Sequence, residues 1–377
     1  MASAARAWVL HVDLDQFIAA VEVLRHPELA GRPLIVGARG DPTERGVVST
    51  ASYEARAFGV GSGMPLRTAA RKVPDAVFLP VDAEEYNAVS SVVMDTLRGL
   101  DGAVVEVLGW DEAFVGVETD APEGFARRIQ AAVLEATGLH CSVGIGDNKV
   151  RAKIATGFAK PRGVYRLTED TWFEVMGDRP TEALWGVGAK TSRKLAALGI
   201  ITVRDLAEAS ARELAERLGP TMGPYFRRLG RGAGSAVVSA EPWVARGHGR
   251  ETTFQANLTD WQEVTQEVRR LAARVTDDIA AERRPAVRVG LKVRYAPFET
   301  HTTSRALDAP TFDVNTIADA AAALVARFDH RRAVRLIGVR AEMAEPGDPV
   351  PADSDSGKAD SGRPESGRPE PGRPAPA

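Results

Sequence analysis

Two acidic strand ends, far apart in the sequence, constrain the fold of this chain more than any other feature. The first follows an apolar run and carries Asp13 and Asp15 in the stretch L-H-V-D-L-D-Q-F. The second is the break G-W-D-E between two predicted strands, which carries Asp111 and Glu112. Carboxylates at the mouth of a buried strand cost free energy unless a partner neutralises them. We therefore expect Asp13, Asp111 and Glu112 to converge on one sheet edge.

Three neighbouring carboxylates repel one another unless metal ions neutralise them, and hard divalent cations prefer oxygen ligands. Two Mg²⁺ or Mn²⁺ ions about 3.5–4 Å apart are the arrangement used for in-line phosphoryl displacement. An isolated Asp-x-Asp more often caps the following helix. The second acidic site is what favours a catalytic centre with two Mg²⁺ ions, or Mn²⁺ in their place.

The composition is that of an ordinary soluble globular protein. The chain has 377 residues, 44% of them hydrophobic and 26% charged, which allows two or three domains. It has no apolar run that could span a membrane and no apolar signal segment at its start. One cysteine, Cys141, excludes a disulfide framework and a cysteine-rich zinc site. We expect a cytoplasmic monomer.

The net charge of −3 does not by itself indicate a nucleic-acid partner. Residues 345–377 hold seven acids and four bases, and without them acids and bases are equal in number. A nucleic-acid surface must therefore be a local basic patch. The tail repeats S-G-R-P-E and is rich in Pro and Gly, a composition that predicts disorder.

The order of predicted elements indicates an α+β protein. Strands alternate with helices up to about residue 165, and neighbouring strands also form hairpins, such as 33–36 with 46–50, which favours a mixed sheet. Residues 166–232 are predicted to form short helices, and residues 233–245 a linker. Residues 246–343 follow the order β-α-β-β-α-β, a recurring compact unit.

Several basic residues are candidates for phosphate binding, although each alone is more often an ordinary surface residue. Tyr53 and Arg56 lie on neighbouring faces of a short predicted helix, and Lys160 ends the run K-I-A-T-G-F-A-K-P. Arg binds phosphate through paired hydrogen bonds, and the Tyr hydroxyl adds a donor.

Two further patterns are candidates for binding a nucleic-acid backbone. The turn W-G-V-G-A-K-T, with Gly186, Gly188 and Lys190, exposes backbone N–H groups at a helix start; the alternative is a simple tight turn. Arg288, Lys292 and Arg294 share parity on a predicted strand and would line one sheet face suited to phosphates. The alternative is a solvated face whose charges pair with the helices.

Together these motifs resemble those of Y-family, lesion-bypass DNA polymerases, in the DinB or DNA polymerase IV branch. The resemblance covers about residues 8–343 and rests on six motifs in order: H-V-D-L-D-Q-F, S-Y-E-A-R-A-F-G-V, W-D-E-A-F, S-V-G-I-G-D-N-K, A-K-I-A-T-G-F-A-K-P and W-G-V-G-A-K-T. It implies low-fidelity, template-directed synthesis on primer-template DNA from dNTPs. It also implies a right-hand polymerase with a palm (1–22 and 76–165), fingers (23–75), a thumb with helix-hairpin-helix turns (166–232), a little finger (246–343) and a tail (344–377).

The resemblance also implies roles for individual residues. The metal ligands would be Asp13, Asp111, Glu112 and the backbone carbonyl of Leu14. The triphosphate contacts would be Thr50, Tyr53, Arg56 and Lys160, and the start of the first helix, Phe17 and Ile18, would complete the nucleotide site. Asp15 matches a supporting position, and Ser49 and Gly63 are small residues over the nascent base pair.

One departure from the family concerns sugar selection. Ile18 stands where the family usually places Tyr or Phe as a steric gate against the ribose 2′-hydroxyl, as in actinobacterial DinB-type enzymes with an aliphatic gate. An apolar wall rejects an added hydroxyl only by about 10² in comparable pockets. We therefore expect ribonucleotides to be accepted. The alternative is that Ile18 is only a core residue of the helix.

A second departure is the C-terminal P-G-R-P-A-P-A, which lacks the apolar peptide that docks many bacterial relatives on the sliding clamp. Clamp recruitment through this end is not expected. Two other function classes stay open at this point. One is a non-catalytic DNA-binding repair scaffold, and the other is a metal-dependent nuclease.

Overall fold

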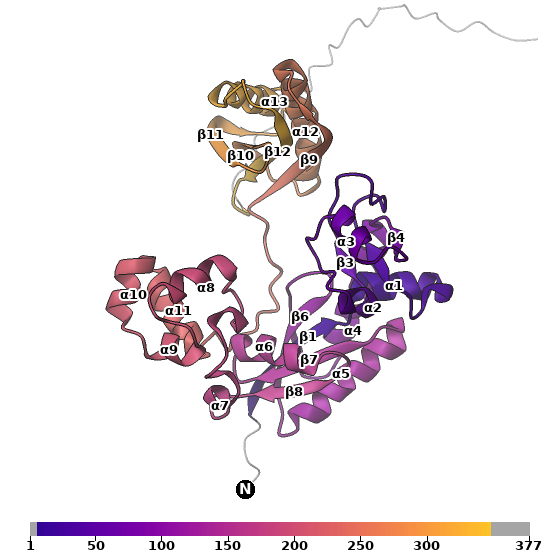
Figure 1. Cartoon of the computed structure of the whole chain (residues 1–377), viewed down its shortest axis with the longest axis vertical. Coiled ribbons are helices and arrows are strands. Elements are labelled where there is room, and N and C mark those ends of the chain that lie inside the picture. Colours follow the sequence, from indigo (N-terminus) through magenta and orange to yellow (C-terminus); the bar gives the residue numbers. More distant parts are fainter. Residues whose placement is uncertain (1–5, 348–377) are drawn as a thin grey trace, which may run out of the picture. The chain divides into compact units, whose positions relative to one another are not determined.

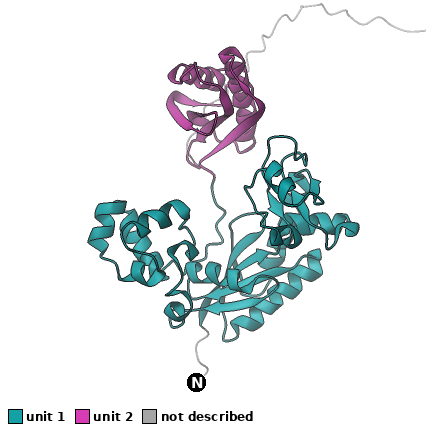
Figure 2. Cartoon of the chain, in the orientation of Figure 1, with its two compact units in different colours: residues 1–244 teal, residues 245–377 magenta. Residues whose placement is uncertain are grey.

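The chain divides into two compact units, of which residues 6–244 and 245–347 are described (Figure 2). The structure is a computed structural model that describes residues 6–347. Most of the tail expected at 344–377, including its C-terminal peptide, therefore lies outside the described residues. Among residues 6–347, no helix has the length and apolar character needed to cross a membrane.

The first unit is built on a five-stranded mixed sheet with the order β5-β6-β1-β7-β8 (Figure 1). Its strands are β1 (Ala7–Leu14), β5 (Val104–Val107), β6 (Glu112–Glu118), β7 (Cys141–Gly146) and β8 (Val164–Leu167). The central strand β1 runs antiparallel to β6 and β7, whereas β7 and β8 are parallel. This arrangement confirms the predicted mixed α+β sheet.

The side chains of β1 alternate between the two faces of the sheet, and this alternation determines which of them face helix α6 (Lys149–Ala159). Leu10 and Val12 belong to the main core, which they share with helices α4 (Ala83–Arg98) and α5 (Pro122–Thr137). Val9 packs on the opposite face with Phe114 and with Ala152 of helix α6. Since side chains alternate between the two faces of a strand, His11 and Asp13 point to the α6 side.

A second, three-stranded sheet has the order β3-β2-β4. Its strands are β2 (Leu34–Val36), β3 (Thr50–Ala51) and β4 (Val77–Leu79), with helices α1 (Phe17–Arg25), α2 (Tyr53–Ala57) and α3 (Leu66–Lys72) and the 3₁₀ turn η1 (Pro27–Leu29). The predicted hairpin forms, but its second strand is shorter and later than 46–50.

The boundary expected between residues 75 and 76 needs correction. Strand β4 pairs in parallel with β2, so it belongs to the small sheet and not to the five-stranded one. Sequence pattern predicts that a short apolar run is a strand, but it does not identify the partner that the run pairs with.

Residues 166–232 begin with the end of β8 and then form short helices, as predicted, around a core to which Val150 and Ala155 of α6 also contribute. These are α7 (Trp172–Met176), η2 (Thr181–Ala183), α8 (Ala189–Ala196), α9 (Val203–Glu208), α10 (Ala211–Leu218) and α11 (Met222–Gly230). The first part of the predicted linker is anchored to the sheet. The Lys149 N–H donates to the Ser235 carbonyl at 2.9 Å, and the Ser239 N–H donates to Glu106 Oε2 at 2.8 Å.

The second unit shows the predicted β-α-β-β-α-β order. Its elements are β9 (Gly247–Leu258), α12 (Trp261–Ala281), β10 (Ala286–Tyr295), β11 (Thr300–Thr311), α13 (Val314–Ala323), η3 (Leu324–Arg327) and β12 (Val334–Met343). The antiparallel sheet has the order β11-β10-β12-β9, and both helices share one core with it. Alternating positions of β10 are buried, which places Val289, Leu291 and Val293 toward the helices.

Candidate active site

Strands β1 and β6 bring the distant acidic segments together. Asp13 lies opposite Glu112 in the antiparallel register, and the Leu14 N–H donates to the Asp111 carbonyl at 2.8 Å. Ligand atoms of His11, Asp13 and Glu112 all lie within 4.8 Å of one another. The Asp111 carboxylate is not a member of this close group. Burial and the nearby charges of Asp13 and Glu112 raise its pKa.

His11 is a member of the site that the sequence reasoning missed. Its side chain is 1% exposed, Nε2 lies 3.2 Å from Glu112 Oε2, and Nδ1 lies 2.9 Å from Thr156 Oγ1. Burial lowers the pKa of His11, so the neutral imidazole is favoured. The sequence does contain a signal for this residue. In the stretch H-V-D, His11 and Asp13 are two positions apart, and residues two apart on a strand lie on the same face.

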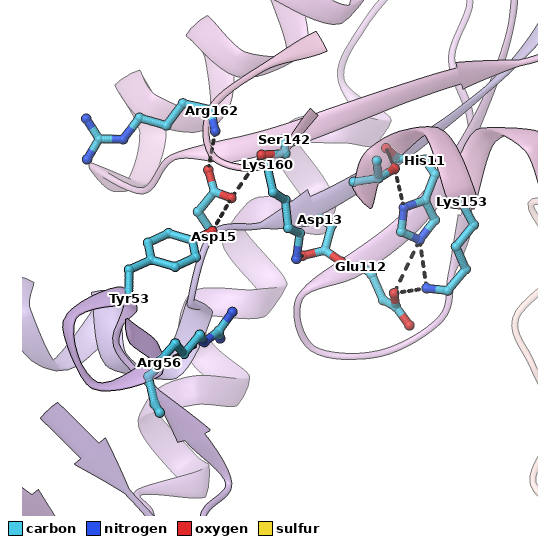
Figure 3. A network of polar contacts seen from close by, with 12 residues as sticks. His11, Asp13, Asp15, Tyr53, Arg56, Glu112, Ser142, Lys153, Lys160 and Arg162 are labelled. Atoms are coloured by element: carbon cyan, nitrogen blue, oxygen red, sulfur yellow. Dashed lines mark hydrogen bonds and ion pairs between the residues drawn. The ribbon is translucent and has the colours of Figure 1, made fainter. Parts of the chain in front are cut away.

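Two lysine side chains approach these carboxylates from α6 and its end (Figure 3). Lys153 Nζ contacts Glu112 Oε2 and lies 3.1 Å from His11 Nε2, while Lys160 Nζ contacts Asp13 Oδ1. The hydrogen bond from His11, together with Lys153, lowers the pKa of Glu112 to about 2. The site therefore keeps an ionised carboxylate, and its carboxylate oxygens fit Mg²⁺ or Mn²⁺.

The carboxylate group opens into a cleft of about 670 Å³, within the range of small-ligand sites. The sheet contributes His11 and Asp13, and helix α6 contributes Lys153. The opposite wall includes Arg179 and Trp185 from the helical segment. Trp185 is 42% exposed, and Lys153 Nζ lies 5.4 Å from its ring centroid, so the cleft combines cations with an exposed aromatic surface.

Asp15 does not join the other carboxylates. It is 5% exposed and accepts hydrogen bonds from the Tyr53 hydroxyl at 2.9 Å, the Ser142 hydroxyl at 2.9 Å and the Arg162 N–H at 2.8 Å (Figure 3). Burial and the bond to Asp15 raise the pKa of Tyr53. Asp15 thus occupies a supporting position beside the site.

The other residues predicted to touch a nucleotide lie around the small sheet. Thr50 begins β3, and Arg56 Nε donates to the Ala51 carbonyl at 2.8 Å. The Arg56 guanidinium lies 5.1 Å from the Tyr53 ring centroid. Phe17 and Ile18 begin α1 and are 2% and 7% exposed within the main core. Ile18 therefore contributes to the core, as the alternative interpretation holds, and keeps a small exposed surface.

The small residues Ser49 and Gly63 lie close together in this part of the chain. The Ser62 hydroxyl donates to the Ser49 carbonyl at 2.8 Å, and Gly63 has a φ of 81°. In the helical segment, Gly186 has a φ of 90°, Gly188 precedes α8, and Lys190 is exposed on its first turn.

The basic residues of β10 lie on the sheet face away from the helices, and each has a partner on another strand of the same sheet. Arg288 lies 3.3 Å from Glu342, Lys292 lies 2.7 Å from Glu251, and Arg294 Nε donates to Thr300 Oγ1 at 2.8 Å. These three residues do not pair with the helices, as the alternative interpretation expected, because their partners lie on strands.

Arg340 is a cation on the same face that the sequence reasoning missed. It lies on β12 between Gly290 of β10 and Gly249 of β9 in the register, and it is exposed. Within residues 6–347 its side chain has no hydrogen-bond or ion-pair partner. It lines a hollow of about 540 Å³ together with the two glycines.

Comparison with known proteins places the chain in a family. Profiles of the impB/mucB/samB family and of its C-terminal domain match residues 12–157 and 245–354. The chain is 51% identical over 348 residues to DNA polymerase IV 2 of Mycobacterium tuberculosis, covering 91% of this chain and 100% of that protein. The chain belongs to the DNA polymerase IV branch of the Y-family DNA polymerases. It is thus a DNA-directed DNA polymerase of the translesion class, as the motifs predicted.

Other members of the Y family support this assignment. DNA polymerase IV of Methanoculleus marisnigri is 41% identical over 346 residues, covering 90% of this chain and 95% of that one. A chimera of the Y-family polymerases Dbh and Dpo4 matches with a TM-score of 0.79 and 27% identity, covering 89% of this chain and 98% of the chimera. This similarity confirms the predicted α+β fold class. Y-family polymerases are metal-dependent enzymes.

Proposed function

We propose that Asp13, Asp111 and Glu112 are the catalytic carboxylates of this polymerase and that they hold two Mg²⁺ ions, with Mn²⁺ as the alternative. The observation that carries the proposal is the β1–β6 pairing, which sets Asp13 opposite Glu112. The Leu14 carbonyl would add a ligand. Such ions neutralise a triphosphate and lower the pKa of the primer 3′-hydroxyl.

The residues around the carboxylates provide the other functions of a nucleotidyl-transfer site. Lys160 Nζ contacts Asp13, so the ammonium lies where it would meet a phosphate bound beside that carboxylate. Arg56, Tyr53 and Thr50 approach from the small sheet and α2, and we assign them to the triphosphate. Binding by several fixed donors orients the reacting phosphorus, which lowers the entropic part of the barrier.

We also propose an assignment of the parts of a right-hand polymerase to the units of the fold. We assign the five-stranded sheet to the palm and the small sheet, through β4, to the fingers. We assign the helices of residues 168–232 to the thumb and residues 246–343 to the little finger. The exposed linker part after Ser239 would join thumb and little finger.

Primer-template DNA and a dNTP are the partners that this assignment requires. A related enzyme has been captured as an insertion ternary complex of Dbh DNA polymerase, at 26% identity and a TM-score of 0.58. We assign DNA backbone contacts to the turn of Gly186, Gly188 and Lys190 and to the sheet face that carries the basic residues of the little finger. These are Arg288, Lys292, Arg294 and Arg340.

Ribonucleotide tolerance is the finer part of the proposal. Ile18 is the second residue of α1, five residues after Asp13, and its branched aliphatic side chain has no ring to press on a ribose. A pocket wall of this kind discriminates poorly against one added hydroxyl. We propose that this polymerase inserts rNTPs more readily than relatives with an aromatic gate.

Primer extension tests the catalytic assignment. A variant with Asp111→Ala and Glu112→Ala should lose extension while it still binds primer-template DNA in a gel-shift assay. Unchanged extension by this variant would remove the proposed site. A wild-type protein that binds DNA but does not extend primers would instead favour the scaffold hypothesis, and shortening of a labelled primer would favour the nuclease.

A further inference from the structure

A single buried carboxylate connects three segments of the first unit. Asp15 Oδ1 accepts from the Tyr53 hydroxyl of α2 and from the Ser142 hydroxyl of β7, and Asp15 Oδ2 accepts from the Arg162 N–H before β8 (Figure 3). Hydrogen bonds to an ionised acceptor are about twice as strong as neutral ones, and burial strengthens them further. Asp15 is therefore a firm connection between separate elements.

Two of these three segments carry the triphosphate contacts proposed above. Tyr53 begins the helix that also presents Arg56, and the Tyr53 N–H donates to Gln16 Oε1 at 2.5 Å. Arg162 lies two residues after Lys160, at the end of the α6 segment. The third segment, at Ser142, presents no proposed phosphate contact.

The backbone around Arg162 shows that this turn is held in place. Arg162 has a φ of 58°, in the left-handed region that residues with a side chain seldom adopt. Such conformations cost free energy and persist where neighbouring interactions determine them. The hydrogen bond from the Arg162 N–H to Asp15 is one such interaction, and it fixes the base from which Lys160 extends.

We propose that Asp15 is a positioning residue that sets the spacing between the two sides of the triphosphate site. Tyr53 and Arg56 form one side, and Lys160 forms the other. This inference rests on the proposed function, because it assumes that these side chains contact the triphosphate. Asp15 itself touches neither the nucleotide nor a metal ion.

The proposal predicts an effect on nucleotide binding that a purely structural residue would not have. Asp15→Asn keeps the size of the side chain but replaces one acceptor oxygen with a donor. In single-nucleotide insertion, its KM for dNTP should rise by about tenfold, while kcat stays within about threefold of wild type. Ser142→Ala is the matched control. It removes one bond to the same carboxylate, and its KM should stay within about twofold of wild type.

A double-mutant cycle separates positioning from general damage. The KM effects of Asp15→Asn and Tyr53→Phe should be non-additive, because both changes break the same connection. Should Asp15→Asn fail to fold, Asp15→Glu replaces it, since the charge is kept and only the length of the side chain, and so the spacing that the carboxylate sets, is changed. A raised KM then supports the proposal, and an unchanged KM overturns it.

The result that would overturn the inference is an unchanged dNTP KM in Asp15→Asn, with or without a fall in thermal stability. That result is distinct from failure of the proposed function, because inactivity of the wild-type protein would show the latter. Equal KM increases in Asp15→Asn and Ser142→Ala would also contradict the inference, since Ser142 lies on the segment without a phosphate contact.

Discussion

Asp13 on β1 lies directly opposite Glu112 on β6, in an antiparallel register that runs from Ala7 to Asp13. The pairing brings acids from distant parts of the chain to the same point. His11 and Lys153 then surround Glu112, and Lys160 contacts Asp13.

Removing the charge of Glu112 should abolish most of the activity. Glu112→Gln keeps the shape of the side chain but loses the anionic oxygen expected to bind metal. Single-turnover primer extension should fall by roughly 10²-fold or more. Glu106→Gln is the control. Glu106 lies on the edge strand β5 of the same sheet and pairs with Lys149 of α6, so this substitution also removes a carboxylate that is paired with a lysine. Activity within twofold of wild type for Glu112→Gln would refute its role.

Changing the side chain at the proposed gate should alter sugar selection. Ile18→Phe adds a flat ring next to the expected ribose position, so rNTP insertion should fall by about 10²-fold relative to dNTP insertion. Leu24→Phe places the same ring on α1 at a site that is 49% exposed, and sugar selection should not change. The readout is the ratio of kcat/KM for dNTP and rNTP on one template. A ratio that is the same in wild type and Ile18→Phe would eliminate the gate.

Arg340 should contribute more to DNA binding than the paired arginine beside it. Arg340→Ala removes a cation whose side chain has no partner within residues 6–347. The Kd for primer-template DNA should therefore rise several-fold, and the salt slope should fall by about one. Arg288→Ala should have a smaller effect, because Glu342 already neutralises that guanidinium. Fluorescence anisotropy at several salt concentrations measures both. Equal effects of the two substitutions would contradict this ranking.

Acid should destabilise the protein through Glu112 and His11. The pKa of Glu112 is lowered to about 2 by its bonds to His11 and Lys153, and burial lowers the pKa of His11. A lowered pKa in the folded state gives stability that is present above the unfolded-state value and is lost as the pH falls toward the folded-state value. Glu112 therefore adds stability above its ordinary pKa of 4.5 and loses it toward about 2.

Urea unfolding between pH 7 and pH 3 measures this dependence. The free energy of unfolding of wild type should fall more steeply below pH 4.5 than that of Glu112→Gln, which has no carboxylate to protonate there. The His11 contribution should be lost below its ordinary pKa of 6.5 in the wild-type protein. Parallel curves for the two proteins below pH 4.5 would show that Glu112 makes no such contribution.

Local pattern was sufficient for much of the fold. Periodicity and turn chemistry predicted the β-α-β-β-α-β unit and the short helices of residues 166–232, because these elements follow from which side chains must be buried. The acidic ends of β1 and β6 were likewise visible, since carboxylates at the end of an apolar strand need a partner.

Only the tertiary structure decided which residues meet. The assignment of β4 to the small sheet, the place of His11 beside Glu112 and the three donors on Asp15 all depend on strand partners and on side chains from distant segments. The same holds for Arg340, which lies between two glycines of the neighbouring strands. A sequence determines burial and local conformation along the chain, whereas pairing across the sheet determines the neighbours of each charge.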